Sequence, residues 1–320
     1  MMKKLLKKIG VLGGIAIGML VALIWLAAIP HMNPIIETIT NSVSYQGLGI
    51  WETLPLLGRA QTQGEHTKLV LGDSVANQLY QKCGDEEYCI LTGNMAMTMM
   101  WQYIYVREAM ESHLETTDIY LCTTPDALDR SFEVGTSYCY VLIPLAESDN
   151  MNVLEETQKE LLQKMYGAFF VKPQVAKFIG KTGLNIKLFL NGIKKFYEIF
   201  PQRKAEVEKK NNPDLELAET YLKKMYELCK EKKVTLHLIP NPKIDTPENR
   251  EYMKRLEEQY KQSSIYDINP DFFEQIVYYP EEYFKDELHF KDELIKEGGQ
   301  VEIIKAIQEA TGTMENLRSR

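Results

Sequence analysis

An uncharged apolar run, Ile9–Ile29, lies close to the N-terminus of this chain. As a helix, a run of this length can cross the roughly 30 Å of hydrocarbon in a bilayer. Four lysines precede it within the first eight residues, and the next lysine or arginine is Arg59. Because basic residues favour the cytoplasmic side of a span, the sequence predicts a single-pass cell-membrane protein with a cytoplasmic N-terminus and an extracytoplasmic C-terminal domain.

A cleaved signal peptide is the alternative interpretation of this run. The small residues Ala27 and Ala28 suit a cleavage site, but the apolar cores of cleavable signals usually extend over only about 7–15 residues. The length therefore favours a retained anchor in contact with the lipid bilayer. The chain is accordingly divided into a basic tip and transmembrane helix over residues 1–30, a membrane-proximal linker over 31–65 and a soluble domain over 66–320.

The charge distribution excludes one class of partner. The formal net charge is −8, and the lysines of the second half of the chain are interspersed with glutamates. Nucleic-acid binding generally requires a basic stripe that neutralises phosphates, often with aromatic residues between the charges. We therefore expect no nucleic-acid partner.

Strand-like and helix-like segments alternate after residue 66, which predicts an α/β domain with a mainly parallel sheet and helices on both faces. A mostly helical stretch broken by prolines is interpreted as an insertion or cap at about 150–232. The predicted strands are Lys68–Leu71, Tyr88–Leu91, Asp118–Thr123 and Val234–Ile239, and the predicted helices are Val75–Gln81, Met97–His113, Asn152–Gly167, Val175–Phe200 and Pro213–Lys232.

Five cysteines follow the apolar run, and an oxidising compartment would allow some of them to pair. Cys83 and Cys89 enclose a polar, turn-like segment and form the first candidate disulfide, while Cys122 and Cys139 flank another loop and form the second. Buried free thiols are the alternative, above all for Cys122 and Cys229, which have apolar neighbours. No CxxC pair and no clustered histidines occur, so we expect neither a metal site nor a cofactor.

A serine directly follows the first predicted strand, in the segment Leu69-Val-Leu-Gly-Asp-Ser74. A side chain in this place lies at the ligand-binding edge of a parallel sheet. Gly72 allows a tight turn, and the N–H groups that open the next helix are expected to point at the same place and to stabilise an oxyanion there. The alternative is a purely structural turn in which Asp73 or Ser74 caps the helix.

Asp286 and His289 form a second signal, three residues apart and just ahead of a predicted C-terminal helix. This offset can place both side chains on one side of a turn. His289 could then take a proton from Ser74 while Asp286 orients the ring and stabilises the imidazolium. The other histidines lack such a partner and are interpreted as surface or core residues: His31, His66, His113 and His237.

Together the two segments resemble the SGNH (GDSL-like) hydrolase superfamily, whose nucleophile follows the first strand and whose Asp-x-x-His pair precedes the last helix. The resemblance extends from about Lys68 to Ala310. It implies a three-layer, SGNH-like (flavodoxin-like) α/β fold. It also implies that Ser74 is the nucleophile, His289 the general base and later acid, and Asp286 the orienting carboxylate.

The oxyanion site implied by this resemblance is incomplete. The family's second block supplies a glycine and its third block an asparagine. Here Gly93 and Asn94 follow the second predicted strand, whereas the third is followed by Thr123-Thr-Pro-Asp126, without an asparagine. A threonine hydroxyl from Thr123 or Thr124 would have to substitute, or Asn94 would reach in from the neighbouring loop. The candidate oxyanion and binding residues are thus Gly72, Asp73, Gly93, Asn94 and Thr124.

An N-terminal span joined to such a domain is similar to the family members that transfer or remove acyl groups on extracytoplasmic polymers, such as alginate and teichoic acid. The resemblance implies a serine esterase or O-acyltransferase acting on acyl, in particular acetyl, esters of a cell-surface glycan or polymer, beside a multispanning membrane acyltransferase. The alternative is a catalytically weak or inactive SGNH-like module that binds glycan or assists such an acyltransferase. The missing asparagine favours the module, and the three triad residues at family spacing favour the enzyme.

Overall fold

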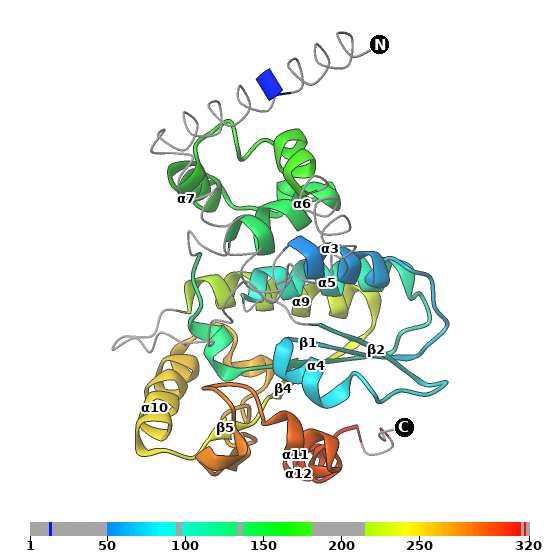
Figure 1. Cartoon of the computed structure of the whole chain (residues 1–320), viewed down its shortest axis with the longest axis vertical. Helices are drawn as coiled ribbons and strands as arrows, with labels where there is room; N and C mark the ends of the chain where they lie inside the picture. Colours follow the sequence, from blue (N-terminus) through cyan, green and yellow to red (C-terminus); the bar gives the residue numbers. More distant parts are fainter. Residues whose placement is uncertain are drawn as a thin grey trace.

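The computed structural model describes residues 13–14, 50–93, 98–132, 137–180, 215–314 and 317. Its centre is a four-stranded parallel sheet with helices on both faces (Figure 1). All four predicted strands are confirmed, with ends that agree to within one residue. The strands are β1 (Lys68–Gly72), β2 (Tyr88–Thr92), β3 (Asp118–Thr123) and β4 (Thr235–Pro240).

The strands lie in the order β2-β1-β3-β4, so the direction of winding reverses between β1 and β3. In open α/β sheets, ligands bind beyond the carboxyl ends of the strands at such a reversal. Gly72 ends β1 and pairs in register with Cys122 near the end of β3. The residues that follow these two strands therefore meet at the expected ligand-binding edge.

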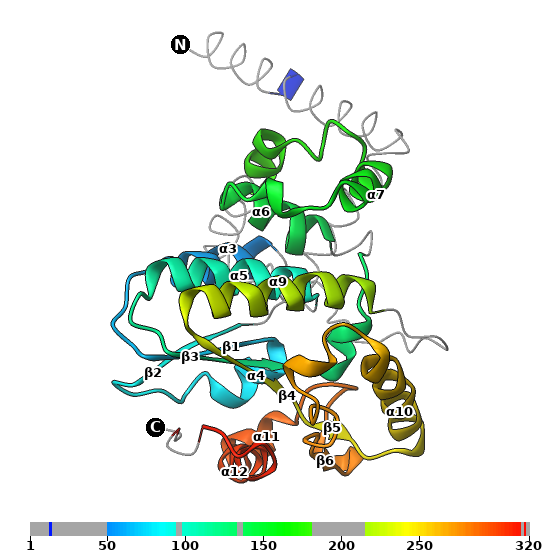
Figure 2. The ribbon, with the colours of Figure 1, turned by 180° about the vertical axis from the view of Figure 1, so that it is seen from behind.

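Alternate residues of the strands enter two separate apolar cores. Leu69 and Leu71 face one core, whereas Val70 faces the other, which is the period of two expected for a strand covered on both sides. Helices α3 (Ile50–Ala60), α5 (Met99–Ser112) and α9 (Glu216–Lys232) cover the first face, and α4 (Ser74–Tyr80) and α12 (Gly299–Thr311) cover the second (Figure 2).

Two predicted boundaries are wrong. Helix α3 lies inside the predicted linker of residues 31–65, yet Leu56, Leu57 and Ala60 are buried in the core, so the α/β domain already includes this helix. Helix α9 lies inside the predicted insertion of residues 150–232, yet it packs on α5 and leads directly into β4. It is the crossover helix between β3 and β4, because a parallel connection must return across a face of the sheet.

A helical layer beyond α3 is formed by α6 (Ile143–Glu147), α7 (Glu156–Tyr166) and a helical segment at 173–180 (Figure 1). The rest of the predicted helix Val175–Phe200 lies outside the described residues. So does the predicted membrane span, apart from residues 13–14. Among the helices that the structure describes, none is long and apolar enough to cross a bilayer.

The segment after β4 carries the chain to the C-terminal part of the site. It contains a short parallel pair, β5 (Lys243–Ile244) and β6 (Tyr278–Tyr279), and helices α10 (Pro247–Gln262) and α11 (Asp292–Lys296). The short helical turns of the described chain are η1 (Pro125–Asp129), η2 (Tyr138–Leu142), η3 (Met151–Val153), η5 (Tyr266–Ile268) and η6 (Glu281–Tyr283).

Candidate active site

Ser74 is the first residue of α4 and lies just beyond the carboxyl end of β1, as predicted. Gly72 makes this turn possible. A Cβ atom at that position would lie 2.2 Å from the carbonyl oxygen of Cys122 and 2.5 Å from the Cβ of Ala76. Only glycine therefore lets β1, β3 and α4 approach closely enough to set Ser74 at the edge of the sheet.

Ser74, His289 and Asp286 lie in one hydrogen-bonded relay. The Nε2 atom of His289 lies 2.8 Å from Ser74 Oγ, and its Nδ1 atom lies 3.0 Å from Asp286 Oδ2. Asp286 Oδ1 also accepts the backbone N–H groups of Leu288 and His289, at 2.9 and 2.7 Å. These distances are within the reach that proton transfer requires. The structure thus brings together the three residues that the sequence predicts as a triad.

The environment of Asp286 favours its ionised form. Its partial burial raises the pKa of the carboxyl group, but the hydrogen bonds from the His289 ring and from the two backbone N–H groups outweigh that effect and hold the pKa below its usual range. A carboxylate at this place stabilises an imidazolium on His289 and keeps Nδ1 protonated. Nε2 is then free to accept the Ser74 proton.

Gln78 fixes the histidine loop against α4. Its Nε2 donates to the carbonyl oxygen of Phe290 at 2.8 Å, and its Oε1 accepts the Phe290 N–H at 2.9 Å. Gln78 lies one helical turn after Ser74, on the same side of α4. The Phe290 ring is fully buried and stacks on Phe284, with ring centroids 4.4 Å apart. The two hydrogen bonds between Gln78 and Phe290 form a clamp that holds the adjacent His289 within hydrogen-bond distance of Ser74. The sequence analysis missed this clamp.

Asp73 is the buried centre of the site. Its Oδ1 accepts the N–H groups of Val75 and Ala76 at 3.0 and 3.2 Å and the side-chain amide of Asn241 at 2.8 Å. Its Oδ2 accepts the Thr124 N–H at 2.7 Å and the Thr124 hydroxyl. Burial raises the pKa of Asp73, and these hydrogen bonds oppose the rise. One carboxylate thus joins the loops after β1, β3 and β4.

This network contradicts two predicted oxyanion contributions. Both donors of Thr124 go to Asp73, and so do the N–H groups of Val75 and Ala76 at the start of α4. Thr123 is fully buried, and its hydroxyl oxygen accepts from Gln102 at 2.9 Å. The physical reason is that buried polar groups must be hydrogen-bonded. The Thr124 donors and the helix N–H groups bind the buried Asp73 carboxylate, and the Thr123 hydroxyl pairs with Gln102 in the core, so these groups do not face the substrate.

Two predicted donors remain compatible with the geometry. The backbone N–H of Ser74 takes no part in the capping of α4 by Asp73. Gly93 follows β2, the neighbour of β1, and a Cβ atom there would lie 2.3 Å from Leu56 Cδ2. Close packing of α3 therefore requires glycine at this position, beside the same edge of the sheet. Asn94 lies outside the described residues.

A second buried contact missed by the sequence analysis lies behind Thr124. Lys243 Nζ is 2.6 Å from Asp126 Oδ2, and both side chains are almost fully buried. Asn241, two residues before Lys243, also donates its backbone N–H to Thr123 at 2.8 Å. The only sequence signal for these contacts is polar residues directly after the ends of β3 and β4. They hold the two loops together below the triad.

The predicted disulfides are not formed between the described cysteines. Cys83, Cys89, Cys122 and Cys229 are free thiols, and the side chain of Cys139 lies outside the described part of the structure. Cys83 packs in the core on the α4 side of the sheet, whereas Cys89 packs on the α5 side, so β2 separates the proposed first pair. Burial raises the pKa of the Cys83 thiol to about 11. Cys122 is fully buried near Asp73, and its pKa is raised by burial.

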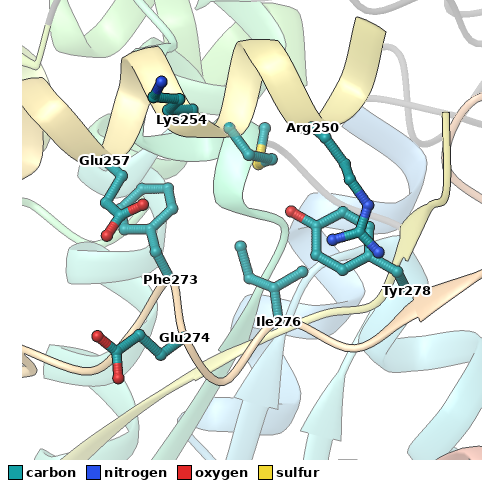
Figure 3. A pocket seen from close by; sticks show the side chains of 8 residues that line it. Arg250, Lys254, Glu257, Phe273, Glu274, Ile276 and Tyr278 are labelled. Carbon is teal, nitrogen blue, oxygen red and sulfur yellow. The ribbon is translucent and has the colours of Figure 1, made fainter. Parts of the chain in front are cut away.

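A polar cavity of about 550 Å³ lies between α10 and residues 273–278 (Figure 3). Arg250 and Lys254 extend from α10 on one side, and Glu274 lies on the other. The Arg250 guanidinium stands 4.0 Å from the centre of the Tyr278 ring. None of the triad residues lines this cavity, so it does not form the reaction site.

No protein-family model matches this chain, and no curated protein or solved structure matches it either. The chemistry of the site therefore depends on its own geometry. That geometry consists of a serine hydroxyl, an imidazole within 2.8 Å of it and a carboxylate 3.0 Å from the other ring nitrogen. Such an arrangement activates a nucleophile for acyl transfer.

Proposed function

We propose that this chain is a membrane-anchored, extracytoplasmic serine esterase or O-acyltransferase with an SGNH-like, flavodoxin-like fold. Its substrates are acyl esters, in particular acetyl esters, of a cell-surface glycan or other polymer. The observation that supports the reaction class is the continuous relay from Ser74 through His289 to Asp286. The strand order β2-β1-β3-β4 is the flavodoxin-like order, and together with the place of Ser74 after β1 it supports the proposed fold.

In the proposed reaction, Ser74 Oγ attacks the ester carbonyl while His289 Nε2 takes the hydroxyl proton. Asp286 stabilises the imidazolium. The N–H groups of Ser74 and Gly93 are the proposed donors to the oxyanion. Collapse of the tetrahedral intermediate leaves the acyl group on Ser74, and His289 returns the proton to the departing alcohol. Water then releases the acyl group in an esterase, or a polymer hydroxyl accepts it in a transferase.

A catalytically weak module that binds glycan or assists a multispanning membrane acyltransferase is the second candidate. One observation favours this module. Thr124 follows β3, where the family's third block supplies an asparagine, but its N–H and its hydroxyl both donate to Asp73 and are not available to an oxyanion. Loss of one oxyanion donor costs about 10²–10³ in rate in other serine enzymes. The two candidates therefore differ in whether Ser74 reacts.

An activated phosphonate ester tests this reactivity, because it traps only a nucleophilic serine. The full-length chain should acquire one covalent adduct, which peptide mass spectrometry should map to Ser74. Ser148 is an internal control, since its hydroxyl donates to the Pro144 carbonyl oxygen and has no histidine partner in the described contacts. Labelling that is absent, or that is equal at Ser74 and Ser148, would favour the binding module.

The anchor gives a separate prediction about location. A reporter fused after residue 320 should be active only outside the cytoplasm, because the lysine asymmetry orients the span. The protein should also remain with the membranes after a carbonate wash. Release of a shorter soluble form would identify a cleaved signal instead. The matched control is the same fusion without residues 1–30, which should lose both membrane association and export.

A further inference from the structure

His66, Cys89 and His113 gather at a place far from the triad in the fold. One ligand atom from each, a ring nitrogen or the Cys89 Sγ, lies within 4.8 Å of the other two. They come from three different elements: the loop before β1, strand β2, and the C-cap of α5. Spacing along the chain gives no sign of such a cluster, since the three residues meet only when these three segments come together in the fold.

Both imidazoles lack the partners that buried polar groups normally have. His113 is only 4% exposed, and neither of its ring nitrogens has a hydrogen-bond partner within the described part of the chain. The buried Nδ1 of His66 has none there either. Buried nitrogens without partners are costly, at about 1–3 kcal/mol each. A bound cation would satisfy one nitrogen of each ring.

The backbone is shaped around these rings. A Cβ atom at Gly64 would lie 2.5 Å from His113 Cε1, 2.6 Å from His113 Nδ1 and 3.3 Å from His66 Nδ1. Any larger residue would displace the rings, so the loop before β1 passes directly against them. Cys89, the third member, is a free thiol and faces the α5 side of the sheet.

We propose that His66, Cys89 and His113 bind a zinc ion. Imidazole and thiolate are the ligands that Zn²⁺ prefers, with bonds of about 2.0–2.1 Å to nitrogen and about 2.3 Å to sulfur. In a tetrahedral site with bonds of these lengths, the ligand atoms lie roughly 3.5 Å apart. Small rotations of the three side chains would bring their ligand atoms, which now lie within 4.8 Å of one another, to that separation. Three protein ligands leave the fourth position to water.

The position of this site indicates a structural role. His66 precedes β1, and Cys89 is the second residue of β2, so both lie toward the amino ends of the strands. Ser74 follows the opposite, carboxyl end of β1. The ion would join the loop, the sheet and α5, and would protect Cys89 from oxidation outside the cytoplasm. This inference is independent of the reaction proposed for Ser74.

Titration of the full-length chain with Co²⁺ tests the site, because tetrahedral cobalt reports its ligands in its spectrum. We expect intense visible bands and a near-ultraviolet sulfur-to-cobalt band that saturate at one equivalent and disappear when Zn²⁺ is added. Cys89→Ser, a nearly isosteric change, should abolish the sulfur band. His66→Asn and His113→Asn should each weaken binding by more than about 100-fold, beyond the usual effect of losing a residue that only supports a ligand.

Two matched variants and a melting experiment complete the test. Cys83→Ser and His237→Asn alter the same residue types outside the cluster and should leave the spectrum unchanged. Zn²⁺, but not Mg²⁺, should raise the melting temperature of the wild type and not that of Cys89→Ser. Cobalt bands that are absent from the wild type, or that persist unchanged in Cys89→Ser, would overturn the proposal.

Discussion

Ser74→Ala and His289→Ala should each reduce the turnover of a small acetyl ester nearly to background, a loss on the order of 10⁴-fold or more. Ser74 forms the covalent bond and His289 moves the proton, so either change disables the whole unit. The double variant should be little worse than either single one, because the two effects are not additive. Initial rates at saturating ester, measured for the three variants and the wild type, check this.

Variants of residues near Ser74 and His289 should lose more activity the more directly the residue takes part in the proton relay. Asp286→Ala should retain more activity than the loss of Ser74 or His289, because it only orients and stabilises the ring. Gln78→Ala should lower kcat further than it raises KM, since the clamp on Phe290 holds the histidine loop and touches no substrate. Glu287→Ala is the control, because it removes an exposed carboxylate next to Asp286 in the sequence and leaves in place the three residues of the relay, Ser74, His289 and Asp286.

Wild-type activity no greater than that of Ser74→Ala would contradict the enzyme proposal for this substrate class. A glycan-binding titration of the same two proteins would then separate the module from an enzyme with another substrate. Equal binding by both would support the module, because Ser74 Oγ would have no covalent role. A clear loss of activity in Asp286→Ala, with activity near that of the wild type in Glu287→Ala, would confirm the choice of carboxylate.

The sheet and the triad were predictable because their signals are local. The four strands are short apolar runs buried on both faces, and each run is visible without knowledge of its neighbours. Asp286 and His289 lie within one turn of the chain, and Ser74 follows a strand that the apolar pattern identifies. Their convergence then follows from the general rule that parallel strands place their carboxyl ends at one edge.

The remainder of the site depends on contacts between distant segments. Asn241 reaches Asp73 across 168 residues, and Gln78 reaches Phe290 across 212. Sequence patterns also do not show which acceptor a donor will meet, so they cannot distinguish a Thr124 hydroxyl that faces the substrate from one that donates to Asp73. Helix α9 is misplaced by the sequence pattern for a similar reason. Its amphipathic pattern predicts a helix but does not show that the helix docks on α5.

Asp73→Ala should destabilise the fold more than any other change in the site, by about 3–5 kcal/mol. Asp73 is 2% exposed, and its carboxylate accepts from Val75, Ala76, Thr124 and Asn241. Its removal would leave these donors buried without an acceptor, and each such group costs about 1–3 kcal/mol before the structure relaxes. Asp73→Asn should lose less stability than Asp73→Ala. The amide oxygen can still accept some of these hydrogen bonds, whereas the amide NH₂ group would face donors with which it cannot pair. Equilibrium urea unfolding of the full-length chain measures both losses.

Asp85 provides the matched control for this experiment. Its Oδ1 also accepts two backbone N–H groups, those of Glu87 at 2.8 Å and Tyr88 at 2.9 Å, but the residue is exposed. Water can replace the lost acceptor there, so Asp85→Ala should cost only about 1 kcal/mol, as for an exposed helix cap. If Asp73→Ala lost no more stability than Asp85→Ala, Asp73 would not be the residue that holds the loops after β1, β3 and β4 together. The position of Ser74 would then have to depend on Gly72 and the Gln78 clamp instead.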